Sequence, residues 1–254
     1  MKNNTILKII VPILLVVVWF GVTENRIVSP LVLPSIKSVG EAFFEQIKNG
    51  RLIEDLWISF LRIIKGYVLA TIFGGALGVA MGIDNKWNQL FLGTLTAVRQ
   101  VPIMAWVPLL VIWFGIGEGS KVAVIFLGAY FPILVNTMSG ISRTDPKLIE
   151  VGKMYHLSKW QMFVKIYFPS ALPSMFVGLK LGLSISWMAV VGAEMIAARS
   201  GIGFRMNDAR SLMQYPVVFC GIFSIAFLGA CMDWMLSKLA KICTPWEQKV
   251  GKNG

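Results

Sequence analysis

The chain has 254 residues, of which 56% are hydrophobic and only 15% are charged. Soluble globular proteins are typically about 45–50% apolar and about 25% charged, so this chain has more apolar surface than one soluble core can bury. The composition excludes a secreted disulfide scaffold, a disordered chain and an ordinary cytosolic enzyme. It indicates an integral membrane protein, in which lipid replaces water around much of the surface.

Neither the net charge of +11 nor the three cysteines points to a separate function. The basic residues lie between apolar segments, and no basic stripe is dense enough to follow a phosphate backbone, so nucleic acid is not an expected partner. Cys220 and Cys231 are eleven residues apart on one expected helix, roughly 16 Å along its axis. A disulfide requires Cα atoms within about 7 Å, so the cysteines are expected to be small, unpaired, buried residues.

Six apolar segments are interpreted as membrane spans, for which about 20 residues are needed. They lie at 6–22, 60–83, 101–115, 122–140, 174–198 and 216–236. The third is the least regular, because residues 89–99 before it can either extend it or form a separate short helix. The first has no small-residue cleavage site after it and is interpreted as an anchor rather than a signal peptide. The chain is expected to be all-α, with residues 1–254 forming a single transmembrane domain.

The distribution of lysine and arginine gives the expected orientation. With the N-terminus inside, thirteen of these residues fall in the cytoplasmic pieces and eight in the outer ones, as the positive-inside rule requires. The inner residues are Lys2, Lys8, Lys86, Arg99, Arg143, Lys147, Lys153, Lys159, Lys165, Lys238, Lys241, Lys249 and Lys252. The outer residues are Arg26, Lys37, Lys48, Arg51, Lys121, Arg199, Arg205 and Arg210. Both termini are therefore expected in the cytoplasm.

Small residues recur at every fourth position in two of the spans. They are Gly66, Ala70, Gly74, Gly78 and Gly82 in the second span, and Ser174, Gly178, Gly182 and Ser186 in the fifth. Small residues at this spacing allow close approach of helix backbones in lipid. Pro102, Pro108 and Pro132 free backbone carbonyls that need other partners. These features favour a tight bundle with broken helices, as in transporters and many other polytopic proteins.

The segment 143–173, between the fourth and fifth spans, is too polar to cross lipid and carries signals for two helices. Asp145 followed by Pro146 predicts a helix N-terminus, and the helix is expected to continue from 147 to about 155. Ser158 and Gln161 form a capping box that begins a second helix, which Pro169 is expected to end.

The second of these helices has an apolar face. Its residues at i, i+3, i+4 and i+7 are Trp160, Phe163, Val164 and Tyr167. A capped helix that exposes aromatic residues requires something to bury them. The groove of a soluble partner and the membrane surface are both consistent with this pattern.

Several motifs in and around this segment have a common resemblance. They are Glu150-Val151-Gly152, His156, Ser158-Lys159-Trp160-Gln161-x-Phe163 and Ile166-x-Phe168-Pro169-x-Ala171-Leu172-Pro173. This set resembles the coupling loop of ATP-binding-cassette (ABC) importer permeases. Residues 99–109 and 113–118, Phe131-Pro132-x-x-x-Asn136-Thr137, Ala193-Glu194-Met195, Gly201-Ile202-Gly203 and Ala209-Arg210 are similar to the nitrate, sulfonate, taurine and bicarbonate branch. The resemblance covers roughly residues 30–240.

This resemblance implies a type I ABC importer permease fold of about six transmembrane helices with a cytoplasmic coupling helix, in a bacterial inner membrane. Such a chain has no catalytic residues and no metal site of its own, and the sequence contains no G-x-x-x-x-G-K-S/T phosphate loop. ATP and Mg would be held by separate ATPase subunits, two of them expected, on a homodimer of the permease chain. An external solute-binding protein would meet the outer connections 24–57 and 199–215 and deliver a sulfonate, a nitrate-like ion or another small organic anion.

The family pattern also implies which residues contact the ATPase. Carried over residue by residue, they are Glu150, Gly152, His156, Leu157, Ser158, Trp160, Gln161 and Phe163. Val151 and Gly152 stand where the family has two alanines, and His156 stands where it has a glycine. Histidine tolerates a left-handed backbone better than most residues do, so His156 is expected to be a turn residue rather than a catalytic group or pH sensor.

Ionisable residues inside the spans are candidates for the substrate pathway, because a lone charge in lipid is costly. Lys180 and Asp233 are expected to pair across helices. Glu194 either lines the pathway or accepts hydrogen bonds from backbone donors, from Arg99 or from Arg210. The other pathway candidates are Arg99, Gln100, Met104 and Trp106.

Two further classes of function are weighed against the importer. An ion-coupled secondary transporter would have the same spans but requires paired inverted repeats, which the sequence does not show. An intramembrane enzyme would require a nucleophile–base pair or a metal cluster, and the chain has one histidine and scattered carboxylates.

Overall fold

The computed structural model describes residues 2–246, and every regular element in this range is a helix. In chain order the elements are α1 (Lys2–Glu24), α2 (Ile36–Lys48), α3 (Arg51–Ile83), α4 (Asn85–Arg99), α5 (Ile103–Phe114), α6 (Glu118–Ser142), α7 (Pro146–Met154), α8 (Lys159–Met162), the π-helical turn η1 (Phe163–Tyr167), α9 (Phe168–Ala197), α10 (Ile202–Ser211) and α11 (Tyr215–Cys243). The expected all-α, polytopic architecture is confirmed. Lys249 and Lys252, used above for the orientation, lie outside the described residues.

Within residues 2–246, four helical runs are long and apolar enough to cross a membrane: α3, α6, Lys159–Ala197 and α11. The pair α4 and α5 is a fifth candidate, bent by 98° at its break. Helix α1 lies at the position of the first expected span, but its apolar stretch, Ile10–Glu24, is shorter than those of the four long runs.

The third expected span is broken rather than straight. Helix α5 has 12 residues, a length of about 18 Å, whereas the hydrocarbon core is about 30 Å thick. Residues 89–99 belong to the separate helix α4, which ends at Arg99. The break falls just before Pro102, which has no N–H to continue a helical ladder and disfavours helical geometry in the residue before it.

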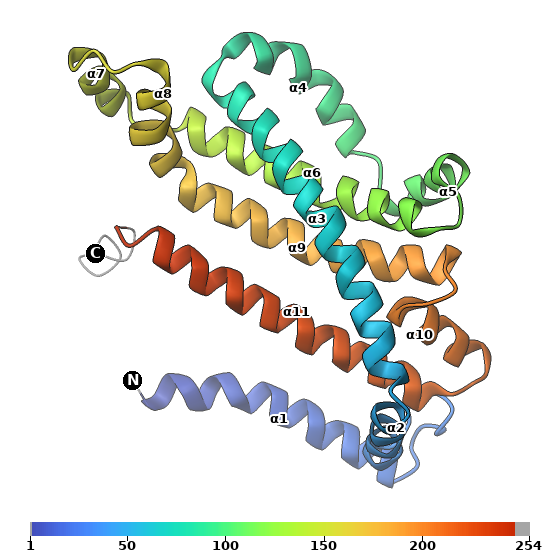
Figure 1. Ribbon diagram of the computed structural model, residues 1–254. Coiled ribbons are helices and arrows are strands. Elements are labelled where there is room, and N and C mark those ends of the chain that lie inside the picture. Colours follow the sequence, from blue (N-terminus) through green and yellow to red (C-terminus); the bar gives the residue numbers. More distant parts are fainter. Residues whose placement is uncertain (1, 247–254) are drawn as a thin grey trace.

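Helix α6 lies between α3 and α9 and contacts both through small residues (Figure 1). A Cβ atom on Gly78 of α3 would lie 2.7 Å from the carbonyl oxygen of Leu134, and one on Gly178 of α9 would lie 2.9 Å from that of Pro132. These backbones therefore approach so closely that only glycine fits without a shift. The two small-residue faces expected from the sequence are confirmed as contact surfaces.

The bundle has two distinct ends (Figure 1). At one end lie the hairpin formed by α7, α8 and η1, the beginning of α1 and the end of α11. We call this the hairpin end. At the other, the loop end, lie α2, the α5–α6 connection and α10. The cytoplasmic position of the hairpin end stays a prediction.

The two outer connections of the sequence analysis are largely helical. The segment 24–57 contains α2 and the first two turns of α3, and the segment 199–215 contains α10. Helix α3 begins at Arg51, nine residues before the expected span, after Gly50 in a left-handed conformation (φ 74°). The span predicted from hydropathy began too late, because the first turns of the helix carry the polar residues Glu54, Asp55 and Ser59.

Pro169 does not end the helix that begins at Lys159, contrary to the expectation. Helix α8, η1 and α9 continue without interruption to Ala197. The N–H of Phe168 bonds to the carbonyl of Phe163, five residues back instead of four. The π-helical turn thus lies directly before Pro169, where the α-helical donor is missing, and the helix continues past it.

The unpaired state of the cysteines and one ion pair between helices agree with the expectations from the sequence. Cys220, Cys231 and Cys243 are all free, as expected, and Cys220 is buried while the other two are half-buried. The ammonium of Lys180 lies 3.8 Å from a carboxylate oxygen of Asp233, which confirms this pair between α9 and α11.

We predict that Gly78→Ala lowers the thermal midpoint of the purified chain in detergent by several degrees. The added methyl group would meet the α6 backbone, and such overpacking typically costs about 1–3 kcal/mol. The control is Gly75→Ala on the same helix, where nothing lies within 4 Å. Equal shifts for the two variants would contradict the close contact.

Candidate functional site

The hairpin between α6 and α9 is built by local hydrogen bonds. The side chain of Asp145 accepts from the N–H of Lys147 and begins α7, with Pro146 as its first residue. At α8 both bonds of the capping box are present: Gln161 N–H donates to Ser158 Oγ, and Ser158 N–H donates to Gln161 Oε1. Both predicted helix starts are confirmed.

His156 forms the turn between the two helices in a left-handed conformation, with φ at 50°. Its N–H bonds to the carbonyl of Lys153, and the next N–H, of Leu157, bonds back to the carbonyl of Gly152. These bonds satisfy the last carbonyls of α7. The expectation that His156 is a turn residue is confirmed in its backbone geometry.

Gly152 allows the two halves of the hairpin to pack together. It is buried, and a Cβ atom there would collide with the side-chain ends of Met162 and Ile166. The absence of a side chain, where the related pattern has alanine, thus leaves room for Met162 to lie against α7.

The hairpin exposes several large apolar side chains among its charged residues. Trp160 is 71% exposed, and the ring of Phe163 lies beside it, tilted by 36°, with centroids 5.8 Å apart. The other exposed apolar residues of the hairpin are Leu148, Val151, Met154, Tyr155 and Val164. Glu150 is exposed on the same hairpin. Of the predicted coupling residues, five are exposed, two are half-buried and one is buried: Glu150, His156, Ser158, Trp160 and Gln161 are exposed, Leu157 and Phe163 half-buried, and Gly152 buried. Their contact with an ATPase stays a prediction.

A cavity of about 400 Å³ lies between the α4–α5 break, α6 and α9. Arg99 and Trp106 line it together with Phe131 and Asn136. Gln100 is exposed beside Arg99. Met104 packs instead against Gly192 of α9, where a Cβ atom would meet the sulfur and methyl end of its side chain. The structure thus brings two of the predicted pathway residues to one cavity.

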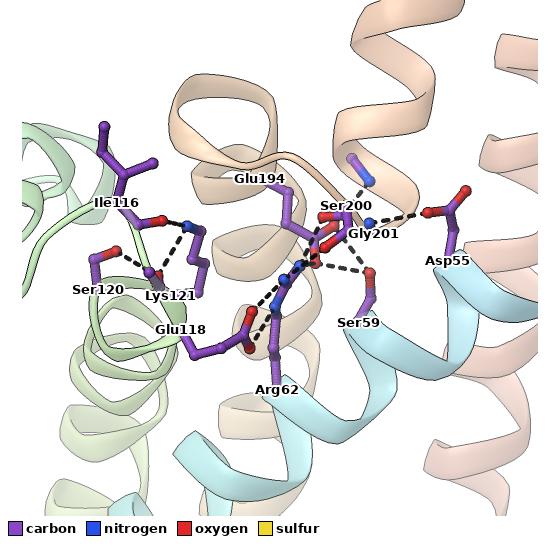
Figure 2. Close-up of polar contacts among 12 residues, drawn as sticks. Asp55, Ser59, Arg62, Ile116, Glu118, Ser120, Lys121, Glu194, Ser200 and Gly201 are labelled. Carbon is purple, nitrogen blue, oxygen red and sulfur yellow. Dashed lines mark hydrogen bonds and ion pairs between the residues drawn. The ribbon is translucent and has the colours of Figure 1, made fainter.

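At the loop end, Arg62 of α3 joins two carboxylates (Figure 2). Its Nε donates to Glu118 at the start of α6 at 2.9 Å, and Nη2 donates to the other oxygen of that carboxylate. Its Nη1 donates to Glu194 of α9 at 2.7 Å and to the carbonyl of Ser200 at 2.8 Å. Nη2 also reaches the hydroxyl of Ser200. Arg62 is 2% exposed and Glu194 1%.

The same group of residues holds the beginning of α10. The N–H groups of Gly201, Ile202 and Gly203 donate to Asp55, Ser59 and Glu194, respectively. Gly201 has φ at 105°, and a Cβ atom on it would collide with the Glu194 carboxylate. Carboxylates at a helix N-terminus are favourable, because the unpaired N–H groups carry partial positive charge.

The partners proposed for Glu194 were partly wrong. A backbone donor is present, but neither Arg99 nor Arg210 reaches it, and the cation is Arg62. Arg62 lies in the second expected span, and it is a partner of Glu194 that the sequence analysis did not identify. An arginine among apolar residues was the available signal, since such a charge must pair inside the bundle.

The described residues contain no group of three or more His, Cys, Asp or Glu side chains that could hold a metal ion. The buried carboxylates at the loop end, Asp55 and Glu194, are already bonded to Arg205, Arg62 and backbone N–H groups. This arrangement fits a structural role.

The comparisons with known proteins agree with this arrangement. The family described as binding-protein-dependent transport system inner membrane component matches residues 66–241. The chain belongs to this family. The match contains the hairpin, the cavity and Glu194, and it begins four residues after Arg62.

Individual relatives extend over nearly the whole chain. The putative aliphatic sulfonates transport permease protein SsuC of Bacillus subtilis (strain 168) is 34% identical over 239 residues, covering 94% of this chain and 87% of that protein. The taurine transport system permease protein TauC of Escherichia coli (strain K12) is 32% identical, with 93% and 88% covered. The nitrate import permease protein NrtB of Synechocystis is 31% identical, with 77% and 71% covered. The resemblance to ABC permeases of the nitrate, sulfonate and taurine branch is confirmed.

We predict that Arg62→Gln destabilises this family member by about 3–5 kcal/mol, because it leaves two carboxylates without their cation. The measurement is unfolding in mixed micelles. The comparison is Lys180→Gln, which removes a longer and more exposed ion pair and is expected to cost about 1 kcal/mol or less. Adding Glu194→Gln to Arg62→Gln should restore part of the loss. No restoration would contradict the assigned pairing.

A second prediction concerns the turn of the hairpin. His156→Val is expected to loosen the hairpin, because a left-handed conformation costs an L-residue roughly 1–2 kcal/mol and is least tolerated by β-branched side chains. His156→Gly should keep or increase its order. The measurement is amide hydrogen exchange of residues 146–167. Faster exchange for the glycine variant than for the valine variant would contradict the argument.

Proposed function

We propose that this chain is the transmembrane permease subunit of an ATP-driven importer for a sulfonate, a nitrate-like ion or another small organic anion. Family membership and the names of the sulfonate, taurine and nitrate relatives support this class of solute. ATP and Mg are held by two partner ATPase subunits, and a separate external binding protein delivers the solute. The chain, a single permease domain, acts as one half of a homodimer.

The exposed hairpin is the observation that carries the proposal. Its helices are fixed by caps on both sides of the left-handed turn at His156, yet Trp160 and Tyr155 remain more than 70% exposed. A preorganised apolar surface loses little conformational entropy on binding. Aromatic residues of this kind are enriched among the residues that dominate binding energy at protein interfaces. An ATPase cleft that covers this surface, with Glu150 at its rim, accounts for both the rigidity and the exposure.

The continuous helix from Lys159 to Ala197 supports a mechanical role for the hairpin. Its 39 residues are about 58 Å long, so one rigid element joins the aromatic surface to Glu194 at the opposite end. Helix α9 also contacts α6 closely through Gly178 and Gly182. ATP-driven displacement of the hairpin would therefore move α9 as a unit against α6, which is the kind of motion that alternating access requires.

The cavity beside the α4–α5 break is the proposed segment of the substrate pathway. Its wall is mainly apolar, with Arg99 as its cationic residue and Trp106 and Asn136 beside it. A single cation in an apolar wall attracts an anion without binding it too tightly to leave. Gln100 lies next to this cavity, and Met104 holds α5 against α9.

The proposed orientation places the hairpin end in the cytoplasm and the loop end outside a bacterial inner membrane. The bias of lysine and arginine supports this orientation, and both described chain ends lie at the hairpin end (Figure 1). The external binding protein would then meet α2 and α10.

The decisive experiment reconstitutes the chain with its ATPase subunits and binding protein in proteoliposomes and follows uptake of labelled taurine and nitrate. We predict that Trp160→Ala weakens association with the ATPase about thirtyfold, as expected for loss of about 2 kcal/mol at a central aromatic residue. Uptake should fall with it. The thermal midpoint of the chain should not change, because Trp160 is mostly exposed.

The matched control is Trp234→Ala on α11, a tryptophan that is 63% exposed but lies outside the hairpin. It should leave ATPase association unchanged. Equal loss for both variants would contradict docking at the hairpin. Uptake driven by an ion gradient in the absence of ATPase and ATP would instead support a secondary transporter.

A further inference from the structure

A second cavity, of about 410 Å³, lies at the loop end between α3, the start of α6 and the connection from α9 to α10. Its polar wall consists of Arg62, Glu118, Lys121, Arg199 and Ser200, with the backbone of 116–117 at one side. The cavity is separate from the one that contains Arg99.

Lys121 is the unusual residue of this cavity. It is 3% exposed, and its ammonium donates to the backbone carbonyls of Ile116 and Gly117, the latter at 2.9 Å (Figure 2). In the part of the chain that the structure describes, it forms no ion pair within 4.0 Å, and the nearby Glu118 is engaged by Arg62. An ammonium has three N–H donors, and these two bonds leave one available.

Two other donors border the same space. Arg199 is exposed, and within residues 2–246 its guanidinium has no hydrogen bond or ion pair. The hydroxyl of Ser200 accepts from Arg62 and retains its own O–H as a donor. Arg62 itself is not available, because its five N–H donors all go to Glu118, Glu194 and Ser200.

The charges around the cavity leave a positive excess. Arg62, Lys121 and Arg199 contribute three positive charges, and Glu118 and the buried Glu194 behind Arg62 contribute two negative charges. The excess of one lies on the Lys121 and Arg199 side, since Arg62 is shared between the two carboxylates. The buried ammonium of Lys121 is hydrogen-bonded only to backbone carbonyls, and the carboxylate near it, Glu118, is shared with Arg62, so an anion in the cavity would add a favourable partner for it.

We propose that this cavity binds one small oxyanion, such as a sulfonate or nitrate group, through Lys121, Arg199 and Ser200. Three donors from α6 and the α9–α10 connection suit an anion with three oxygens, and charge-assisted bonds to such a group are strong. Its role as the place where the permease first receives the solute rests on the proposed function, whereas the binding itself does not.

The test uses the purified full-length chain in nanodiscs of zwitterionic lipid, without ATPase or binding protein. Methanesulfonate, nitrate and chloride are titrated separately at constant ionic strength, and binding is followed by calorimetry. We predict saturable binding of methanesulfonate and nitrate, weakened about tenfold or more by Arg199→Gln through loss of a charge-assisted hydrogen bond. The matched control is Arg51→Gln, another exposed arginine at the loop end that lies outside the cavity and should bind as the unchanged chain does.

Lys121→Met is the second variant, and its folding is checked by its thermal midpoint. Retained binding in a folded Lys121→Met chain would overturn the proposal, as would equal binding of chloride or equal affinities for Arg199→Gln and Arg51→Gln. Loss of binding in discs of anionic lipid would assign the site to lipid phosphate and overturn the role in solute capture. Saturable oxyanion binding in a chain that shows no ATP-dependent uptake would uphold the site while contradicting the proposed function.

Discussion

The pairing of Arg62 with Glu118 and Glu194 is the interaction on which the loop end of the bundle depends. The guanidinium comes from α3 and the two carboxylates from α6 and α9; Arg62 and Glu194 are buried, so each of these two charges would be costly alone, whereas Glu118 pairs with Arg62 from a partly exposed position. The two buried charges depend on their pairing with each other. Because all five N–H donors of Arg62 are used, the helices cannot slide past one another at this end without exposing an unpaired buried charge.

Close packing brings the helices together, whereas this ion pairing sets their register. The small residues of α3 and α9 let both helices approach α6, but lipid gives little hydrophobic preference for one register over the next. The charges fix the register at the loop end. Helix α9 connects the paired charges at the loop end to the hairpin, because η1 allows the helix to continue past Pro169. The hairpin and the loop end are thus the two ends of one element.

The hairpin was the part of the fold most fully predictable from the sequence. Asp145, Ser158 with Gln161, and the left-handed His156 each satisfy backbone groups within five residues, so a local pattern is sufficient to specify them. The end of the second helix was not predictable by the same reasoning. The expectation that proline ends a helix assumes hydrogen bonds between residues four apart. In the π-helical turn before Pro169 the bonds join residues five apart, so the helix continues.

The sequence by itself determined the all-α membrane class, the small-residue contact faces and the capped hairpin, because apolar periodicity and local hydrogen bonding specify them. Only the tertiary structure decided which cation pairs with Glu194, since Arg62 is 132 residues away and several arginines carry the same charge. It also decided the 98° bend between α4 and α5 and the gathering of Lys121 and Arg199 at one cavity. Such pairings depend on how distant helices pack, and no pattern along the chain encodes that geometry.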